Sequence, residues 1–405
     1  MRLLIPVFSP ATGTWGGLTR VVAIGEAAAR AGHRFAFCAS GYLQTALRQR
    51  GYQVYALPAT TMFGLPAPLS RLLEKRSQMV SPPVRPGKSI GDIWFVLAIS
   101  GFARPGFLRR LVEAELQAAR DFQPDALFTD LDPGAAFAAE VLGLPIARNY
   151  ASIIQTGIGS PGWRLMNRAS TVVARAFGLP IRPIDAFMFN PSILKIIPSI
   201  PELDDTDPSR PDVHYVGHMV GAIHPEASER FQIELGRRYV FVYTGTGSIS
   251  LTVLRRVLPQ VFPQGSPTTC LVGGQSIMQT ERIGSVEFHP YVPAGEVLPH
   301  CDWTISHSGQ NTIAQSLLNG VPLILFPGPI FERRYNARKV QENGAGIMGE
   351  VDQFTPAWLQ QAFTQRAGYA DAAARLGDRM RSFGGAQAAV EAIEALVDSQ
   401  QLSRS

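Results

Sequence analysis

Residues 303–337 read WTISHSGQNTIAQSLLNGVPLILFPGPIFERRYNA, and this stretch decides the fold. The apolar run Trp303–Ser306 predicts a strand that stops at His307, and residues 311–319 are good helix formers. A Gly-Val-Pro sequence ends that helix, and Leu323–Phe326 then predicts a short, buried parallel strand. The order strand, tight turn, helix, strand is typical of an α/β protein.

The turn itself indicates a binding site. His307 and Gly309 stand where the strand gives way to the helix. Main-chain N–H groups and the positive end of the helix point at one spot there, and such a spot binds an anion, most often a phosphate. The alternative is an ordinary turn in which the histidine only caps the helix, and the turn alone does not separate the two.

The same alternation of apolar strands and helical patterns occupies most of the chain. It predicts a doubly wound parallel sheet in each half. Residues 197–216 are rich in Pro and Asp and are typical of a linker. We therefore expect one Rossmann-like domain over 1–205, a second one over 206–385, and a C-terminal helix and tail over 386–405. A cleft between two such domains is the usual place for a ligand.

Composition narrows the class of protein. Of the 405 residues, 46% are hydrophobic and 17% charged, which is typical of a globular chain with enough material for two cores. The formal charge of +5 is compatible with an anionic substrate or with peripheral contact to a membrane surface. The 37 basic residues are dispersed, without zinc-finger spacings or RNA-binding aromatic motifs, so nucleic acid is not an expected partner.

The cysteines and the apolar runs bear on location. Cys38, Cys270 and Cys301 are far apart, which favours reduced thiols over disulfides or a zinc site. The opening MRLLIPVFSP is too short for the apolar region of a signal peptide and predicts a first strand. No apolar run reaches 18 residues. We expect a cytoplasmic protein.

Residues 289–340, from HPYVPAGEVLPHCDW through the opening stretch to NARKV, closely resemble the donor-binding segment of family 1 glycosyltransferases. The resemblance implies the GT-B fold, in which two Rossmann-like domains face a central cleft. It also implies a UDP- or dTDP-sugar as co-substrate, with no cofactor. A weaker likeness in strand order extends over nearly all of the chain.

The resemblance also assigns roles. It places base and ribose contacts at Tyr291, Val292 and Gln315, diphosphate contacts at His307, Gly309, Asn311 and Thr312, and sugar contacts at Glu332 and Arg333. Two of these depart from the family pattern. Gln315 replaces a common Glu but can still hydrogen-bond a hydroxyl, and Arg333 replaces a Gln, which leaves the identity of the sugar open.

The physical chemistry of glycosyl transfer agrees with these assignments. The diphosphate leaving group gains negative charge as its bond to the sugar breaks, and preorganised donors such as His307 and the helix start stabilise that charge. The TGTGS loop, with Thr246 and Ser248, could add donors from the other side; a plain tight turn is its alternative. No pair of carboxylates in a metal-binding context is present, so no metal is expected.

The N-terminal half lacks an expected base. Family members carry a histidine after the first strand that takes the proton of the acceptor hydroxyl. That register falls on Gly17, and Thr14 and Trp15 in the same loop would only line the acceptor site. Asp130 matches the carboxylate that orients the missing histidine. Without that histidine, Asp130 or its neighbour Asp132 could contact the acceptor directly and serve as base, while the alternative for each is a cap on the next helix.

Other histidines and aromatics receive weaker interpretations. His33 is expected to be structural, and the pair His214 and His218 lacks a third ligand for a metal. Regions 58–105 and 149–182 are rich in aromatic residues, which favours an apolar acceptor pocket; domain core is the alternative.

The leading hypothesis is an inverting, metal-independent glycosyltransferase that moves a hexose or deoxyhexose to a small, largely apolar acceptor, either a natural product or a lipid. His307 would hold the diphosphate and Asp130 would be the base. Three rivals remain: transfer to a membrane-bound, lipid-linked acceptor, a sugar-nucleotide epimerase on the same fold, and a non-catalytic helper that retains only nucleotide binding or only the fold.

Overall fold

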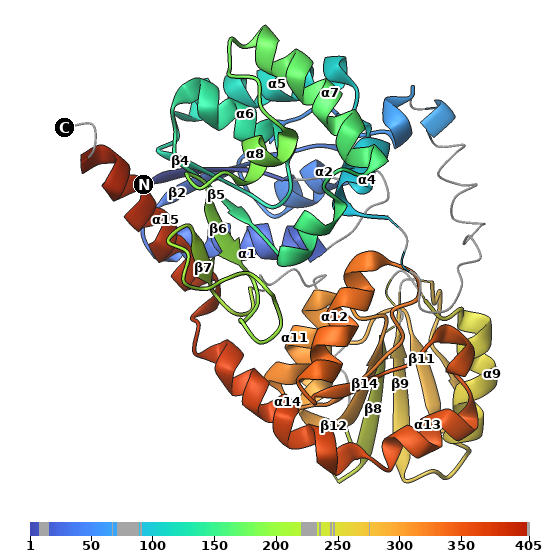
Figure 1. Ribbon diagram of the computed structural model, residues 1–405. Coiled ribbons are helices and arrows are strands. Elements are labelled where there is room, and N and C mark those ends of the chain that lie inside the picture. The colour runs from blue at the N-terminus through green and yellow to red at the C-terminus, as the bar shows by residue number, and fades with distance from the viewer. Residues whose placement is uncertain are drawn as a thin grey trace.

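The computed structural model describes residues 1–7, 16–66, 68–70, 89, 91–219, 233–234, 236–243, 245, 248–274 and 276–402. They form two α/β domains, one above the other in Figure 1, and the C-terminal helices run from the second domain back to the first. Thr14, Trp15 and Thr246, three of the predicted site residues, lie outside the described residues.

The first domain is built on a parallel sheet of seven strands in the order β3-β2-β1-β4-β5-β6-β7. Its strands are β1 (Arg2–Pro6), β2 (Arg34–Ala39), β3 (Val54–Ala56), β4 (Ala126–Thr129), β5 (Ile146–Asn149), β6 (Leu194–Ile197) and β7 (Val213–Tyr215). Its helices are α1 (Gly16–Arg30), α2 (Gly41–Gln49), α4 (Ile93–Leu97), α5 (Pro105–Phe122), α6 (Pro133–Leu142), α7 (Pro161–Ala176) and α8 (Ile184–Phe189).

The second domain repeats the plan with the strand order β10-β11-β9-β8-β12-β13-β14, in which only the β10–β11 pair is antiparallel. Its strands are β8 (Arg238–Tyr243), β9 (Thr268–Gly273), β10 (Glu281–Ile283), β11 (Val286–His289), β12 (Cys301–Ser306), β13 (Leu323–Leu325) and β14 (Gly346–Met348). Its helices are α9 (Leu251–Val261), α10 (Ala294–Val297), α11 (Gln310–Leu318), α12 (Phe331–Glu342), α13 (Pro356–Phe363) and α14 (Arg366–Arg381), after which α15 (Gly385–Leu402) leads away.

These strand orders fix where a ligand binds. In a doubly wound sheet the chain reverses direction at one switch point, and the loops at the carboxyl ends of the two strands there diverge and leave a crevice. The switch point lies between β1 and β4 in the first sheet and between β8 and β12 in the second. The loop of the opening sequence stretch follows β12, and Asp130 follows β4. The predicted site residues therefore lie at the switch points.

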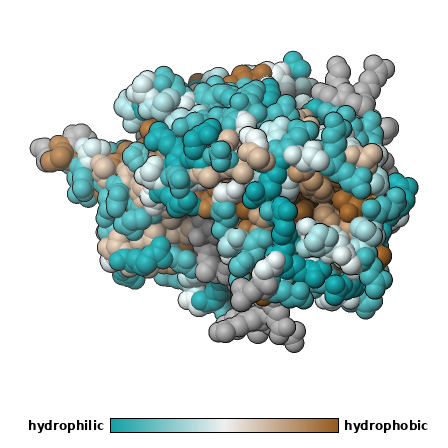
Figure 2. Space-filling view, turned by 90° about the horizontal axis from the view of Figure 1, so that it is seen from below, coloured by the Kyte–Doolittle hydropathy of each residue, from teal (hydrophilic) through white to brown (hydrophobic). Residues whose placement is uncertain are grey.

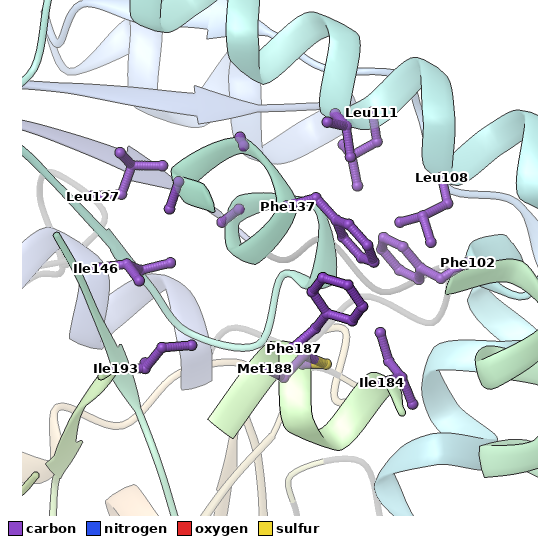
Figure 3. Packing of buried hydrophobic residues seen from close by; sticks show 14 of the residues in the cluster. Phe102, Leu108, Leu111, Leu127, Phe137, Ile146, Ile184, Phe187, Met188 and Ile193 are labelled. Carbon is purple, nitrogen blue, oxygen red and sulfur yellow. The ribbon is translucent and has the colours of Figure 1, made fainter. Parts of the chain in front are cut away.

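Alternating side chains of the first sheet bury apolar groups on both of its faces. Leu127 of β4 belongs to the core on one face, whereas its neighbour Phe128 belongs to the core on the other. Figure 3 shows the first of these cores, where the rings of Phe137 and Phe187 stack with centroids 4.5 Å apart. Fully burying one such side chain stabilises the fold by about 1.5–3 kcal/mol, so the two cores hold the sheet rigid.

The domain boundaries differ from those predicted. β7 pairs with β6 in parallel, so the first sheet continues past residue 205 into the stretch predicted as a linker. The C-terminal helix α15 returns to the first domain and packs on α1, where Val390 and Ile393 join its core (Figure 1). The end of the chain thus ties the two domains together and is not a separate unit.

Within the described residues, no helix combines the length and the apolar character needed to cross a membrane. Seen from below, the molecule shows hydrophilic residues over most of its face, with apolar residues gathered near the middle and to the right (Figure 2).

Candidate active site

The loop after β12 is held in an uncommon conformation. Ser308 is fully buried and has a φ of 69°, a left-handed geometry that non-glycine residues rarely adopt. Its carbonyl accepts a hydrogen bond from the Asn336 amide at 3.2 Å, and its N–H donates to Ser306 Oγ at 3.2 Å. Such a backbone costs about 1–3 kcal/mol and is found mostly at functional sites. The loop is therefore fixed by α12 from one side and by its own strand from the other.

The helix that follows begins without a side-chain cap. Gly309 occupies the N-cap position of α11 and has no side chain to cap it, and no other described side chain is seen to accept from the N–H groups of the first turn. The first N–H groups of a helix need partners, and the helix dipole favours a negative one. The predicted diphosphate position is thus a helix start that an anion can cap, while Thr312, on the same turn, is buried.

His307 is enclosed by the loop that follows β8. A Cβ at Gly245, whose φ is 51°, would lie 2.1 Å from His307 Cε1, so only glycine fits there. The Tyr243 ring lies 5.7 Å from the imidazole, centroid to centroid. The pKa of His307 is lowered to about 4: burial is the largest cause, the Arg333 charge acts in the same direction, and a hydrogen bond with the Tyr243 backbone opposes both. The imidazole is therefore neutral at pH 7: it is a hydrogen-bond donor and not a cation.

The first turn of α12 brings charged groups to the same place. Asn336 already touches the Ser308 carbonyl, and Arg333 lies one helical turn before it, on the same face. Burial lowers the pKa of Arg333, and neighbouring Glu332 raises it. An arginine stays protonated at neutral pH in proteins, so a positive charge lies beside His307.

The other residues predicted to contact the sugar donor differ in their exposure and in their hydrogen bonds. Tyr291 is 39% exposed, whereas the Val292 side chain is buried against Gly273. Gln315 lies half-buried on α11, one turn beyond Asn311. The Ser248 hydroxyl donates its hydrogen to the carbonyl of Phe326. This hydrogen bond ties Ser248 to the end of β13, and the contact of Ser248 to a phosphate stays a prediction.

Across the cleft, the side chain of Asp130 is buried and hydrogen-bonded. Its carboxylate is 5% exposed and accepts hydrogen bonds from Arg20 Nη2 at 3.1 and 3.3 Å and from Asn149 Nδ2 at 2.9 Å. A Cβ at Gly17 would lie 2.4 Å from Asp130 Oδ2. The carboxylate thus stands in the space that any side chain at position 17 would need. Sequence reasoning missed Arg20 and Asn149, because only the folded chain brings them to Asp130.

Asp132 caps the helix that follows it. Its side chain is 2% exposed and caps α6 by accepting from the Gly134 N–H at 2.8 Å. Of the two alternatives for Asp132, acceptor contact and helix cap, the structure shows the cap. Burial raises the pKa of Asp132 to about 6, although the Gly134 N–H and the Arg148 charge lower it.

A second carboxylate lies behind Asp132 in the core. Glu115 of α5 is fully buried, and neither of its oxygens has a hydrogen-bond partner among the described residues. Burial and then the Asp132 charge raise the pKa of Glu115 well above its usual value, against a lowering by Arg148. Arg148, also fully buried, donates instead to the carbonyls of Asp132 and Met188, at 2.9 and 2.6 Å. Glu115, Asp132 and Arg148 thus form a buried cluster of charged groups next to β4 and β5.

The two halves of the site meet through neighbouring helix starts. The Asn311 amide donates to Thr19 Oγ1 at 3.0 Å, and Arg20 Nη1 donates to Gln310 Oε1 at 3.4 Å. A pocket of about 540 Å³, counted with the solvent at its mouth, opens between α11, α12 and the segment after β6. Gln310, Glu332 and Asn336 are among its lining residues.

The aromatic residues of the first domain divide between core and surface. Trp94 and Phe102 are buried in the core, so for these two the core alternative holds. Phe63 and Phe95 are each 48% exposed. Phe331, at the start of α12, packs against the core of the first domain. An apolar surface therefore adjoins the predicted sugar contact at Glu332.

The other histidines stay outside the site. His33 contacts the N-terminal amine at 3.2 Å and hydrogen-bonds Glu394 of α15, which confirms its structural role. Burial lowers the pKa of His218 to about 4, as does the charge of Arg20. No group of three or more metal-ligating side chains gathers anywhere in the described part of the chain.

Comparisons with known proteins extend these observations. Two domains with these strand orders and facing switch points define the GT-B class of fold. The glycosyltransferase of kitacinnamycin has it too, with a TM-score of 0.73 and 17% identity over 98% of both chains. The glycosyltransferase VinC, solved in complex with dTDP, gives a TM-score of 0.68 and 18% identity, over 98% of this chain and 100% of that one.

Sequence relatives specify the family. The model of the erythromycin biosynthesis protein CIII-like C-terminal domain matches residues 275–396. Demethyllactenocin mycarosyltransferase of Streptomyces fradiae is 28% identical over 44% of this chain and 41% of its own. The 4'-demethylrebeccamycin synthase of Lentzea aerocolonigenes is 25% identical over 57% and 63%. The chain thus matches less than two thirds of either relative. Together the comparisons indicate family 1 natural-product glycosyltransferases of the GT-B type, which confirms the resemblance seen in the sequence.

The crowding at Gly17 can be tested by adding one methyl group. Gly17→Ala would push the Asp130 carboxylate away from Arg20 and Asn149, at a cost of about 1–3 kcal/mol for the hydrogen bonds lost. The matched control is Gly368→Ala, also in the first turn of a helix, where nothing lies within 4 Å of the new Cβ. We expect the control to gain about 0.5–1 kcal/mol in the free energy of unfolding, and Gly17→Ala to lose stability. Equal gains in urea denaturation would contradict the packing described.

The buried Glu115 predicts a pH dependence of stability. Its pKa is raised in the folded state, so above pH 4.5 folding must take up a proton that the unfolded chain has released. Stability present at low pH is therefore lost as pH rises. Glu115→Gln cannot ionise and should become more stable than the wild type by up to about 1.4 kcal/mol per pH unit between pH 5 and 7. Denaturation at several pH values checks this, and parallel pH profiles for the two proteins would refute it.

Proposed function

We propose that this protein is an inverting, metal-independent glycosyltransferase that moves a hexose or deoxyhexose from a UDP- or dTDP-sugar to a small, largely apolar acceptor. One observation carries the proposal: the uncapped start of α11, with His307 beside it, contacts the start of α1 beside Asp130. A site for a leaving anion and a buried carboxylate thus face each other across the cleft.

The reaction follows from this arrangement. The acceptor oxygen attacks the anomeric carbon from the side opposite the diphosphate, and the bond from that carbon to the diphosphate oxygen breaks. The leaving group departs with the electron pair, and the acceptor proton passes to the Asp130 carboxylate. The N–H groups of α11, the neutral imidazole of His307 and the Arg333 charge stabilise the diphosphate. Attack from the opposite side inverts the anomeric configuration.

The donor and the acceptor are supported by different observations. The solved relative VinC binds dTDP, which supports a pyrimidine diphosphate here and favours neither base by itself. Tyr291, half-exposed at the proposed base position, is available to pack on it. Phe95 is 48% exposed, and the side chains of Phe95 and Phe331 both lie next to Gly91. These rings favour an apolar acceptor beside the sugar contact at Glu332.

A second function has one observation in its favour. Asp130 is already paired with Arg20 and Asn149, so its carboxylate oxygens have hydrogen-bond donors before any acceptor binds. A helper protein that binds the nucleotide without catalysis would have no need of a base. Calorimetry with UDP and dTDP, run beside transfer assays over a panel of UDP- and dTDP-sugars, separates the two. Nucleotide binding without transfer to any acceptor would favour the helper.

Replacing His307 tests the leaving-group site. Loss of one preorganised donor typically costs about 10²–10³ in kcat, so His307→Ala should lose that much, while His307→Gln, which keeps a donor, should lose less. Since the pKa of His307 is about 4, titration of this imidazole should not affect kcat between pH 6 and 8. The control is His300→Ala, on an exposed turn. Unchanged turnover in His307→Ala would remove the residue from the site.

Arg333 should strengthen binding of the donor. Arg333→Gln keeps hydrogen-bonding capacity but removes the charge beside His307, so the Kd for the nucleotide diphosphate should rise about tenfold at low salt, less at high salt. Arg338→Gln is a matched control, because Arg338 lies on the same helix with an exposed side chain paired to Glu342 at 3.4 Å. Calorimetric titration with UDP and dTDP gives both constants. Equal affinities in the two variants would place Arg333 outside the diphosphate site.

A further inference from the structure

Arg20 is the one charged side chain that contacts Asp130 among the described residues. Nη2 lies within hydrogen-bonding distance of both carboxylate oxygens, and Asn149 holds Oδ1 from the side of β5. The backbone of Gly17 closes a third side. The carboxylate is therefore fixed in direction by three elements, α1, β5 and its own strand.

Arg20 also reaches the second domain. Its Nη1 donates to Gln310 Oε1 at 3.4 Å, and the Gln310 amide donates in turn to the Pro198 carbonyl at 3.0 Å. Gln310 is the first residue of α11, whose N–H groups form the anion site. The side chain of Arg20 is 16% exposed, so little water competes for these contacts. One guanidinium thus connects the carboxylate at one switch point to the helix start at the other.

We propose that Arg20 is a positioning residue for the transfer. It directs the Asp130 carboxylate toward the acceptor hydroxyl, and through Gln310 it keeps that carboxylate aligned with the diphosphate site. The inference rests on the proposed function. Arg20 exchanges no proton, because a guanidinium stays charged throughout. The acceptor proton goes to Asp130, the acceptor oxygen bonds to the anomeric carbon, and the diphosphate leaves with the electron pair of the broken bond.

The geometry explains why an arginine is used. A planar guanidinium has several N–H donors in fixed directions, so it can serve a carboxylate and an amide oxygen at once. A lysine at position 20 would supply the charge at a single point and could not hold both partners in one plane. A neutral side chain would leave the buried Asp130 carboxylate with Asn149 as its remaining donor and would free it to rotate. A misplacement of about 1 Å in a reacting group can cost a hundredfold in rate.

The test compares Arg20→Met and Arg20→Lys with Arg30→Met, a change at an exposed arginine at the end of the same helix. For Arg20→Met we expect kcat for transfer to fall about 10- to 100-fold, with the Kd for UDP or dTDP within threefold of the wild type. Arg20→Lys should recover part of the loss, and Arg30→Met should match the wild type. Thermal unfolding of each variant shows whether the fold is kept, and Arg20→Lys carries the same test if Arg20→Met does not fold.

A double-mutant cycle with Asp130→Asn makes the test specific. If Arg20 acts through Asp130, the double variant should be about as slow as Asp130→Asn alone, because residues that act as a unit are not additive. Additive losses, or a kcat within threefold of the wild type in Arg20→Met, would overturn the role of Arg20 and leave the proposed function standing. A wild type that transfers no sugar from any UDP- or dTDP-donor would overturn the proposed function itself, and the role of Arg20 with it.

Discussion

The contact between the first turns of α1 and α11 is the interaction on which the rest of the site depends. Each helix follows one of the two strands at the switch point of its sheet, α1 after β1 and α11 after β12, so each presents its positive end to the cleft. Two positive helix ends repel unless something negative or polar lies between them. Asp130 supplies the negative charge on one side, and the Thr19 and Gln310 side chains supply acceptors between the helices. The packing of the two helix starts thus depends on the compensation of their positive ends as well as on their shape.

Other contacts hold the two domains in the same register. The Ser152 hydroxyl lies 2.7 Å from the Tyr335 hydroxyl, which donates to Asp205 at 3.1 Å, and α15 returns from the second domain to pack on α1. Burial raises the pKa of Tyr335 above its usual value, so the phenol remains protonated at neutral pH. These contacts border the pocket described above, because Tyr335 is one of its lining residues. They fix the relation of the domains, and the α1–α11 contact can then be made by short polar side chains.

The sequence was sufficient for the parts of the structure that depend on local pattern. The strands that end just before His307 and Asp130 are short apolar runs, as is typical of buried strands. Their ends could be predicted because polar residues follow directly. β7 could not be predicted from the sequence, because a strand of three residues within a Pro- and Asp-rich stretch shows no periodicity. The contacts of Arg20 could not be predicted either, since its partners lie 110 and 290 positions away in the chain. Helix capping by Asp132 and base chemistry share one sequence pattern, and the cap shows only in the hydrogen bond that Asp132 accepts from the Gly134 N–H.

The departures of this chain from the family pattern make physical sense together. With glycine at position 17, no imidazole lies between Asp130 and the acceptor, and the carboxylate itself fills that space. A buried carboxylate needs a partner, and Arg20 provides it from the next turn of the same helix. On the other side, His307 is too buried to carry a charge, so in the proposed reaction Arg333 would supply the positive charge near the leaving diphosphate. Arg20 would in turn hold the carboxylate near the acceptor. Restoring a histidine at position 17 alone would therefore displace Asp130 before it could act as a base.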